Sequence, residues 1–141
     1  MDQMDALYTA TATASGDGRN GHTESDDGVL ALDVRIPKEM GGPGGATNPE
    51  QLFAAGYAAC FHSALKLVGR SKSADLTDSE VSASVSIGTL PDGGFGLAVG
   101  IVVHAPHLDR ETTATLVHEA HQVCPYSNAT RGNVEVTLDV V

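Results

Sequence analysis

The stretch from Gln51 to Leu65 constrains the fold of this chain more than any other segment, because it contains no Asp, Glu, Lys or Arg. Apolar residues would lie on all sides of a helix formed by this stretch, a pattern typical of a helix buried in a core or an interface. His62 and Ser63 interrupt the apolar run, so we expect it to be too short to span a bilayer. The sequence therefore predicts one long buried helix around which the fold is organised.

The ends of this helix carry their own signals. Asn48 and Pro49 suit the N-cap and the first helical position, and Thr47 with Glu50 offers an alternative capping box that starts one residue earlier. We expect the helix to end near Gly69. With either start, Glu50 lies in the first turn, where the helix dipole favours a carboxylate.

Alternation of apolar and polar residues predicts half-buried strands at residues 7–14, 29–36, 81–87, 95–103 and 134–140. The third and fourth strands are joined by a Pro-Asp-Gly-Gly turn and form a β-hairpin. A second helix is capped by Asp109 and ended by Pro125. Residues 15–21 carry three glycines and form a turn-rich link in which Arg19 is prominent. This order predicts an α+β fold with largely antiparallel sheet, as one domain over residues 1–141.

The charge of the chain narrows its possible functions. Eight Lys and Arg residues stand against eighteen Asp and Glu, so the formal net charge of −10 repels phosphate backbones and anionic lipid. We expect neither nucleic-acid binding nor membrane association. The first residues form neither a basic n-region nor an apolar h-region, which predicts a cytoplasmic location. In that reducing compartment a cysteine pair is more often catalytic, redox-active or metal-binding than a permanent disulfide.

Cys60 and Cys124 are the two cysteines of the chain and lie 64 positions apart, so they can meet only if the fold brings them together. Cys60 lies within the predicted buried helix, where it is either a small core residue or a reactive thiol. Burial alone raises the pKa of a thiol, so reactivity requires a nearby cation. Arg19, flanked by glycines in its link, is the best placed of the few cations.

The position of Cys124 predicts a different role. Its helix stops at Pro125, so we expect a looser setting than that of Cys60, and a helix C-terminus disfavours the thiolate. Such a thiol suits attack on an already oxidised sulfur.

Glu50 is either a carboxylate favoured by the helix dipole or the partner of Arg19. It lies ten residues from Cys60, about 15 Å along a helix, a gap that a second subunit could close.

A metal site is the alternative use of the second helix. His118, His121 and Cys124 recur every three residues, and two histidines at that helical spacing could bind a metal ion. The pattern lacks a recognised ligand motif, and surface histidines are common on amphipathic helices. The spacing therefore leaves open a metal-binding domain, or a redox-sensing domain without turnover.

Four segments of the chain resemble one known family. They are Leu7–Ala10, Gly18–Gly21, Thr47–Phe61 and Val123–Asn133, which includes Cys-Pro-Tyr-Ser-Asn-Ala-Thr-Arg-Gly-Asn. Together they resemble the organic hydroperoxide resistance branch of the OsmC-like family, nearly from end to end. The last segment is the most specific of the four and favours this branch over its OsmC sibling.

The resemblance implies an OsmC-like fold as an intertwined homodimer, with a long buried central helix, a second helix and two active sites at the subunit interface. It implies a peroxidase of the oxidative stress response that reduces organic hydroperoxides. Cys60 matches the peroxidatic cysteine, which becomes a sulfenic acid, and Cys124 matches the resolving cysteine, which forms a disulfide with it. Arg19 and Glu50 match the charged pair that activates and orients the site.

The same resemblance suggests which small molecules take part. No bound cofactor is expected, and a lipoyl dithiol, as dihydrolipoamide or on a lipoylated protein, is expected to reduce the disulfide. Phe53 and Tyr57 share the helix face of Cys60 at spacings of seven and three. They would form an apolar mouth that suits alkyl or fatty-acid hydroperoxides better than hydrogen peroxide.

Overall fold

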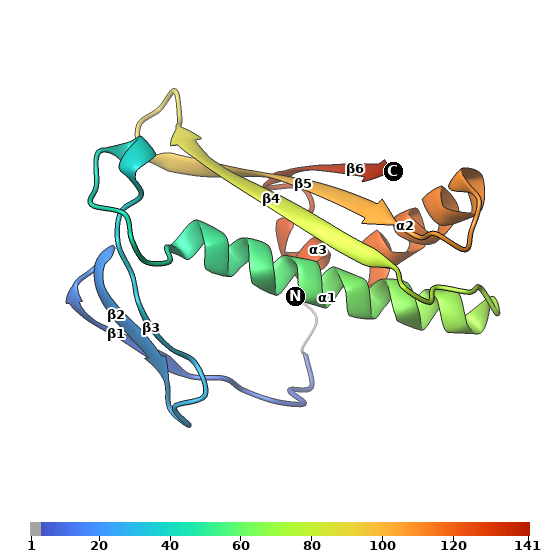
Figure 1. Cartoon of the computed structure of the whole chain (residues 1–141), viewed down its shortest axis with the longest axis horizontal. Coiled ribbons are helices and arrows are strands. Elements are labelled where there is room, and N and C mark those ends of the chain that lie inside the picture. Colours follow the sequence, from blue (N-terminus) through green and yellow to red (C-terminus); the bar gives the residue numbers. More distant parts are fainter. Residues whose placement is uncertain (1–3) are drawn as a thin grey trace. The chain divides into compact units, whose positions relative to one another are not determined.

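The predicted long helix is present as α1 (Pro49–Ser71) in the computed structural model, which describes residues 4–141 (Figure 1). It begins at Pro49, as predicted, and runs two residues past Gly69. Its 23 residues are long and apolar enough, by length and composition alone, to cross a membrane, so the expectation that it is too short is wrong. Core helices of soluble proteins meet the same criterion.

Only one face of α1 is buried within the chain. The buried residues recur at helical spacing and are Tyr57, Phe61, Ala64, Leu65 and Gly69. Ala55, Ala59, Ser63 and Leu67 lie on the opposite face and are exposed. The prediction of burial on all sides is therefore not met by this chain alone, because a single sheet and helix layer covers one side of a helix.

The chain divides into two units, Met1–Pro49 and Glu50–Val141. The second, which we call the cysteine unit, contains α1, β4 (Glu80–Thr89), β5 (Phe95–His104), α2 (Arg110–Val123), α3 (Pro125–Thr130) and β6 (Glu135–Val140). The first, which we call the hairpin unit, contains β1 (Ala12–Asp17), β2 (Asn20–Ser25), β3 (Ala31–Asp33) and the short 3₁₀ helix η1 (Lys38–Met40). That the chain is one domain stays a prediction.

The sheet of the cysteine unit has the order β4-β5-β6. The predicted hairpin is confirmed, with β4 and β5 antiparallel and Val85 opposite Val99. β6 pairs with β5 in parallel, with Ile101 opposite Leu138, so this half of the sheet departs from the expected antiparallel pattern. The two strands are separated in sequence by α2 and α3, and a helical crossover is what allows neighbouring strands to run parallel.

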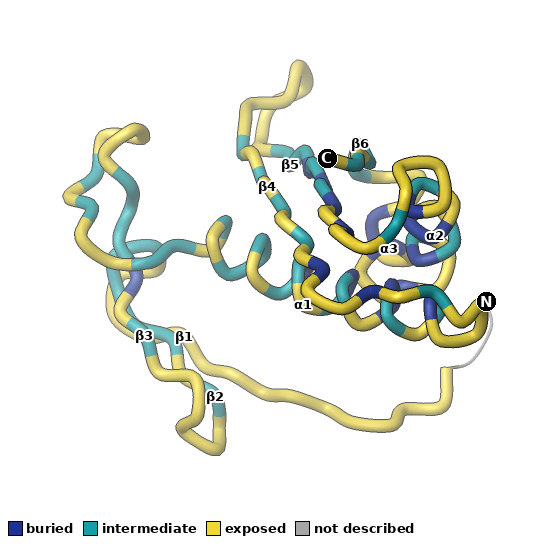
Figure 2. The backbone as a smooth tube through the Cα atoms, turned by 45° about the vertical axis from the view of Figure 1, so that its right-hand side comes forward, coloured by how far each residue is buried: buried dark blue, intermediate teal, exposed yellow. Residues whose placement is uncertain are grey.

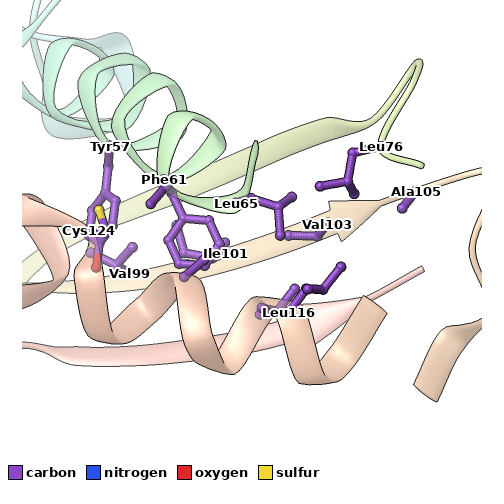
Figure 3. Close-up of a cluster of buried hydrophobic side chains, with 13 residues drawn as sticks. Tyr57, Phe61, Leu65, Leu76, Val99, Ile101, Val103, Ala105, Leu116 and Cys124 are labelled. Carbon is purple, nitrogen blue, oxygen red and sulfur yellow. The ribbon is translucent and has the colours of Figure 1, made fainter. Parts of the chain in front are cut away.

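The core of the cysteine unit lies between α1, β5 and α2 (Figure 3). Phe61, Ile101 and Leu116, one from each element, are at most 1% exposed. Cys124 belongs to the same buried cluster. Burial of side chains of this size contributes about 1.5–3 kcal/mol each, so the core holds α1 and the end of α2 together beside the cysteines.

The hairpin unit is a three-stranded antiparallel sheet of order β1-β2-β3. Its first strand starts at Ala12 rather than at residue 7, and residues 15–21, expected to form a loop, belong mostly to two paired strands. Only Gly18 and Arg19 form the turn, where φ of +63° at Gly18 favours glycine. The glycine at position 21 does not mark a loop. A Cβ there would lie 2.2 Å from the Ser15 carbonyl oxygen, so only glycine lets the two strands pair at this position.

Candidate active site

The sulfur atoms of Cys60 and Cys124 lie 3.6 Å apart, and both cysteines are free. The prediction that the fold brings them together is confirmed. A disulfide has a sulfur–sulfur distance of about 2.05 Å, so the two thiols are in contact and unbonded. Cys60 is half-buried and Cys124 is completely buried, which corrects the expectation that Cys124 has the looser setting.

Cys124 lies at the joint between α2 and α3. Its backbone is extended, its N–H donates to the Ala120 carbonyl at 2.9 Å, and its own carbonyl accepts from Asn128 at 2.9 Å. Pro125 cannot continue α2, because it has no N–H and its ring excludes the preceding helical turn. It does suit the first position of α3. Residue 124 therefore caps both helices, and its side chain points to α1.

The surroundings of Cys60 within the cysteine unit favour the protonated thiol. Burial is the largest influence and raises the pKa of Cys60, and the nearby Cys124 raises this pKa further. A backbone hydrogen bond from Tyr126 acts in the other direction and lowers the pKa, because it stabilises the thiolate. Burial outweighs it, so a reactive thiolate requires a positive charge beyond these groups.

Three aromatic rings gather near Cys60. The ring of Tyr126 lies 6.1 Å from that of Phe53 and 5.6 Å from that of Tyr57, in edge-on and tilted contacts. A Cβ at Gly56 would lie 2.9 Å from the Tyr126 hydroxyl, so glycine lets this ring approach α1. Phe53 is half-buried and Tyr126 is 40% exposed. Sequence reasoning missed Tyr126, although its place two residues after Cys124 and beside a helix-starting proline was a signal for it.

Tyr57 is completely buried, unlike the other two rings. Its hydroxyl lies 2.8 Å from the Ser127 hydroxyl and 3.2 Å from that of Thr130. The Ser127 hydroxyl also lies 2.8 Å from Nδ1 of His121. We call these four side chains the hydroxyl network. Contact of Tyr57 with a substrate stays a prediction.

The alternative metal site does not form. Within residues 4–141 there is no group of three or more His, Cys, Asp or Glu side chains that could hold a metal ion. Nδ1 of His121 is bonded to Ser127 instead. Burial is the largest influence that lowers the pKa of His121, and the nearby Arg131 and His118 lower it further. These influences favour the neutral imidazole in the hydroxyl network.

The two charged residues of the predicted site lie in different units. Arg19 occupies the β1–β2 turn of the hairpin unit. Glu50 is the second residue of α1, on the same helix as Cys60 and about 15 Å away along its axis. The roles of Arg19 and Glu50 at the cysteines stay predictions.

Comparisons with known proteins agree with the resemblance seen in the sequence. The family described as OsmC-like protein matches residues 42–139. An organic hydroperoxide resistance protein of Xanthomonas axonopodis pv. citri is 53% identical over 134 residues, which are 94% of this chain and 93% of that protein. The organic hydroperoxide resistance protein OhrB of Bacillus subtilis is 52% identical over 138 residues, 96% of this chain and 98% of its own.

Solved structures give the same result for the fold. The crystal structure of an organic hydroperoxide resistance protein from Legionella pneumophila matches with a TM-score of 0.92 at 53% identity, over 96% of this chain and 98% of that one. The structure of OhrB of Bacillus subtilis matches with a TM-score of 0.88 at 50% identity, over 96% of this chain and all of the other. A pair of adjacent thiols, a shared α+β fold and this degree of identity lead to one conclusion: the chain belongs to the organic hydroperoxide resistance branch of the OsmC-like family.

Proposed function

We propose that this protein is a cytoplasmic thiol peroxidase that reduces organic hydroperoxides to alcohols through Cys60 and Cys124. The observation that carries the proposal is the 3.6 Å contact between two free thiols from distant parts of the chain. A peroxidase of this type needs a second thiol within reach of the first. Family membership supports the substrate class, because its relatives are named for resistance to organic hydroperoxides.

The reaction balances with these two thiols and one external reductant. The Cys60 thiolate attacks the distal oxygen of ROOH, the O–O bond breaks, and the alkoxide takes a proton and leaves as ROH. Cys60 is then a sulfenic acid. Cys124 attacks its sulfur, a disulfide forms, and the hydroxyl leaves as water after protonation. An external dithiol then returns two electrons and two protons and is itself oxidised to a disulfide.

The burial of the two thiols supports the order of these steps. Cys60 is half-buried, so a hydroperoxide can reach its sulfur, whereas Cys124 is completely buried behind it. A resolving thiol needs to meet only the sulfur of Cys60, and it does so at 3.6 Å. We therefore assign Cys60 as the peroxidatic cysteine and Cys124 as the resolving cysteine.

Activation of Cys60 is proposed to come from Arg19, with Glu50 orienting the guanidinium. Burial raises the pKa of Cys60, so at neutral pH the thiolate needs an added cation. A thiol with a pKa near 8.5 is about 3% ionised at pH 7, and lowering the pKa to about 6 would raise that fraction more than tenfold. A carboxylate paired with the arginine would hold its planar fork in place.

The substrate class follows from the rings beside Cys60. Phe53 and Tyr126 are partly exposed, their rings lie 6.1 Å apart, and the Tyr126 backbone hydrogen-bonds to Cys60. The apolar surface of such rings favours an alkyl or fatty-acid chain over the small, polar hydrogen peroxide. The buried Tyr57 would support the rings of Phe53 and Tyr126 in this apolar mouth.

The proposed assembly is an intertwined homodimer that covers the exposed face of α1. Leu67 on that face is 55% exposed, and Ala55 and Ala59 are also exposed. In such a dimer, Glu50 of the partner subunit could reach the site of Cys60 and complete it. The proposed reductant is a lipoyl dithiol, free or bound to a protein.

A steady-state assay tests the proposed function. Untagged protein is given dihydrolipoamide as reductant and either an alkyl hydroperoxide or hydrogen peroxide as substrate. We expect a higher kcat/KM for the alkyl hydroperoxide. Disulfide formation without turnover would instead favour a redox-sensing domain.

A further inference from the structure

The hydroxyl network brackets Cys124 in the sequence and in space. His121 precedes Cys124 by three residues and Ser127 follows it by three, yet His121 Nδ1 and the Ser127 hydroxyl lie 2.8 Å apart. This bond crosses the joint between α2 and α3 at the residue where the main chain leaves the helix. Arg131 reinforces the joint, since its guanidinium donates to the His121 carbonyl and, at 2.8 Å, to Asn128.

The same network also ties the joint to α1 beside the two sulfurs. Tyr57 precedes Cys60 by three residues on α1, one turn away on the same face. Its hydroxyl lies 2.8 Å from that of Ser127. Two contacts therefore join α1 to the α2–α3 joint side by side, one between sulfur atoms and one between hydroxyl groups.

We propose that Tyr57, Ser127 and His121 are positioning residues that hold the Cys124 sulfur against Cys60 for disulfide formation. This inference rests on the proposed function. The step it serves is Cys60–SOH plus Cys124–SH giving the disulfide and water. Cys124 has one backbone hydrogen bond to each helix, but Pro125 has no N–H with which to continue α2, so side-chain bonds across the joint help to fix its angle.

Each hydroxyl of the network can donate one hydrogen bond. With His121 neutral and its proton on Nε2, the Ser127 hydroxyl donates to Nδ1 and accepts from Tyr57. Thr130 donates to the Ser127 carbonyl at 3.2 Å. Among residues 4–141 no buried side-chain nitrogen or oxygen lacks a hydrogen-bond partner. Satisfied buried networks rigidify the elements that they join.

The test separates the two chemical steps. Tyr57→Phe removes one hydroxyl and keeps the ring, and Ser127→Ala removes the shared hydroxyl. After rapid mixing with cumene hydroperoxide, Cys60 oxidation is followed by loss of thiolate, and the sulfenic acid is trapped with a cyclic diketone. We expect Ser127→Ala to leave Cys60 oxidation unchanged. In both variants the sulfenic acid should accumulate and disulfide formation should be slower by roughly tenfold, because alignment of the reacting atoms is lost.

A second readout does not depend on peroxide. The dithiol–disulfide equilibrium in dithiothreitol buffers should become tenfold less favourable to the disulfide, a shift of about 30 mV to less negative potential. If the wild-type protein fails to react with any hydroperoxide, the proposed function fails, but this equilibrium still tests the positioning.

Matched variants distinguish positioning from general loosening. Thr113→Val removes an equally buried hydroxyl of α2, which donates to the Asp109 carbonyl at 2.8 Å and lies outside the network. It should leave both readouts unchanged. His121→Ala should slow disulfide formation, and His121→Asn, whose amide can take the place of Nδ1, should restore most of it. Wild-type rates in folded Tyr57→Phe and Ser127→Ala proteins would overturn the proposal, as would equal slowing by Thr113→Val.

Discussion

The two units of this chain differ in how far each can stabilise its own fold. The cysteine unit has a buried core that includes Cys124, whereas Val34 is the one buried residue in the hairpin unit among residues 4–49 (Figure 2). A three-stranded sheet with so little buried surface depends mainly on its ladder hydrogen bonds and needs another surface to cover it. In the proposed mechanism, the cysteine unit provides the redox pair and the hairpin unit provides a cation on a turn.

Removal of the sulfurs tests whether the redox pair resides in the cysteine unit and should have the largest effect. We expect Cys60→Ser to abolish peroxide reduction, because its sulfur attacks oxygen. Cys124→Ser should still oxidise once and then stop at the sulfenic acid. Single-turnover stopped-flow measurements decide this, and equal loss of the first oxidation in both variants would contradict the assignment.

Removal of Arg19 tests the contribution of the hairpin unit. We expect Arg19→Ala to raise the pKa of Cys60 by about one unit or more and to slow oxidation at pH 7 by about tenfold, since one unit corresponds to about 1.4 kcal/mol. The rate of thiol alkylation rises with pH as thiolate forms, so the variant's profile should move to higher pH. An unshifted profile would remove Arg19 from the mechanism.

Arg19→Lys is the matched variant for this test. An ammonium keeps the positive charge but lacks the planar fork that can bind a carboxylate and face a sulfur at once. We therefore expect an intermediate rate. A full rescue by lysine would mean that charge alone is sufficient and that Glu50 has no orienting role.

Gly56→Ala tests how the cysteine unit shapes the mouth beside Cys60. The new methyl group would lie 2.9 Å from the Tyr126 hydroxyl, so the ring must move. Overpacking would cost about 1 kcal/mol of stability. Displacement of the ring should separately lower kcat/KM for a bulky hydroperoxide by about fivefold, which corresponds to about 1 kcal/mol in the activation free energy. Alanine also favours the helix by about 1 kcal/mol, so stability should change little. Equal effects on tert-butyl and fatty-acid hydroperoxides would argue against a role of this ring in selectivity.

Acidification should change the stability contributions of His121 and His22 in opposite directions. This is the smallest of the expected effects. Burial lowers the pKa of His121 below its usual 6.5, so its contribution to stability is complete above pH 6.5 and is lost as pH falls through this window. Hydrogen bonds to Asp33, the larger influence, and to Glu24 raise the pKa of His22. Its contribution to stability is therefore complete below pH 6.5 and is lost as pH rises through its folded pKa.

Unfolding by urea at several pH values measures both contributions. His121→Asn should lose less stability than the wild type as pH falls below 6.5. His22→Asn should lose most relative to the wild type in acid and little at pH 8. Identical pH profiles for all three proteins would show that neither histidine is linked to folding.

The predictions from sequence succeeded where a pattern is local. They failed where contacts with other elements of the chain determine the structure. The charge-free run marked α1, and alternation marked β4, β5 and β6 within a few residues. The glycines of residues 15–21 predict a loop, but Gly16 and Gly21 belong to paired strands. Tyr126 escaped notice because its proximity to Cys60 arises from the packing of the α2–α3 joint on α1.

The sequence by itself determined the long helix, the β4–β5 hairpin and the family, because periodicity and short motifs are properties of neighbouring residues. Only the tertiary structure decided that Cys124 is the more buried thiol, that β6 runs parallel to β5, and that α1 has one covered face. It also decided that His121 faces Ser127 and not a metal site. These features depend on contacts between different helices and strands, and such contacts are set by packing and burial in the whole fold.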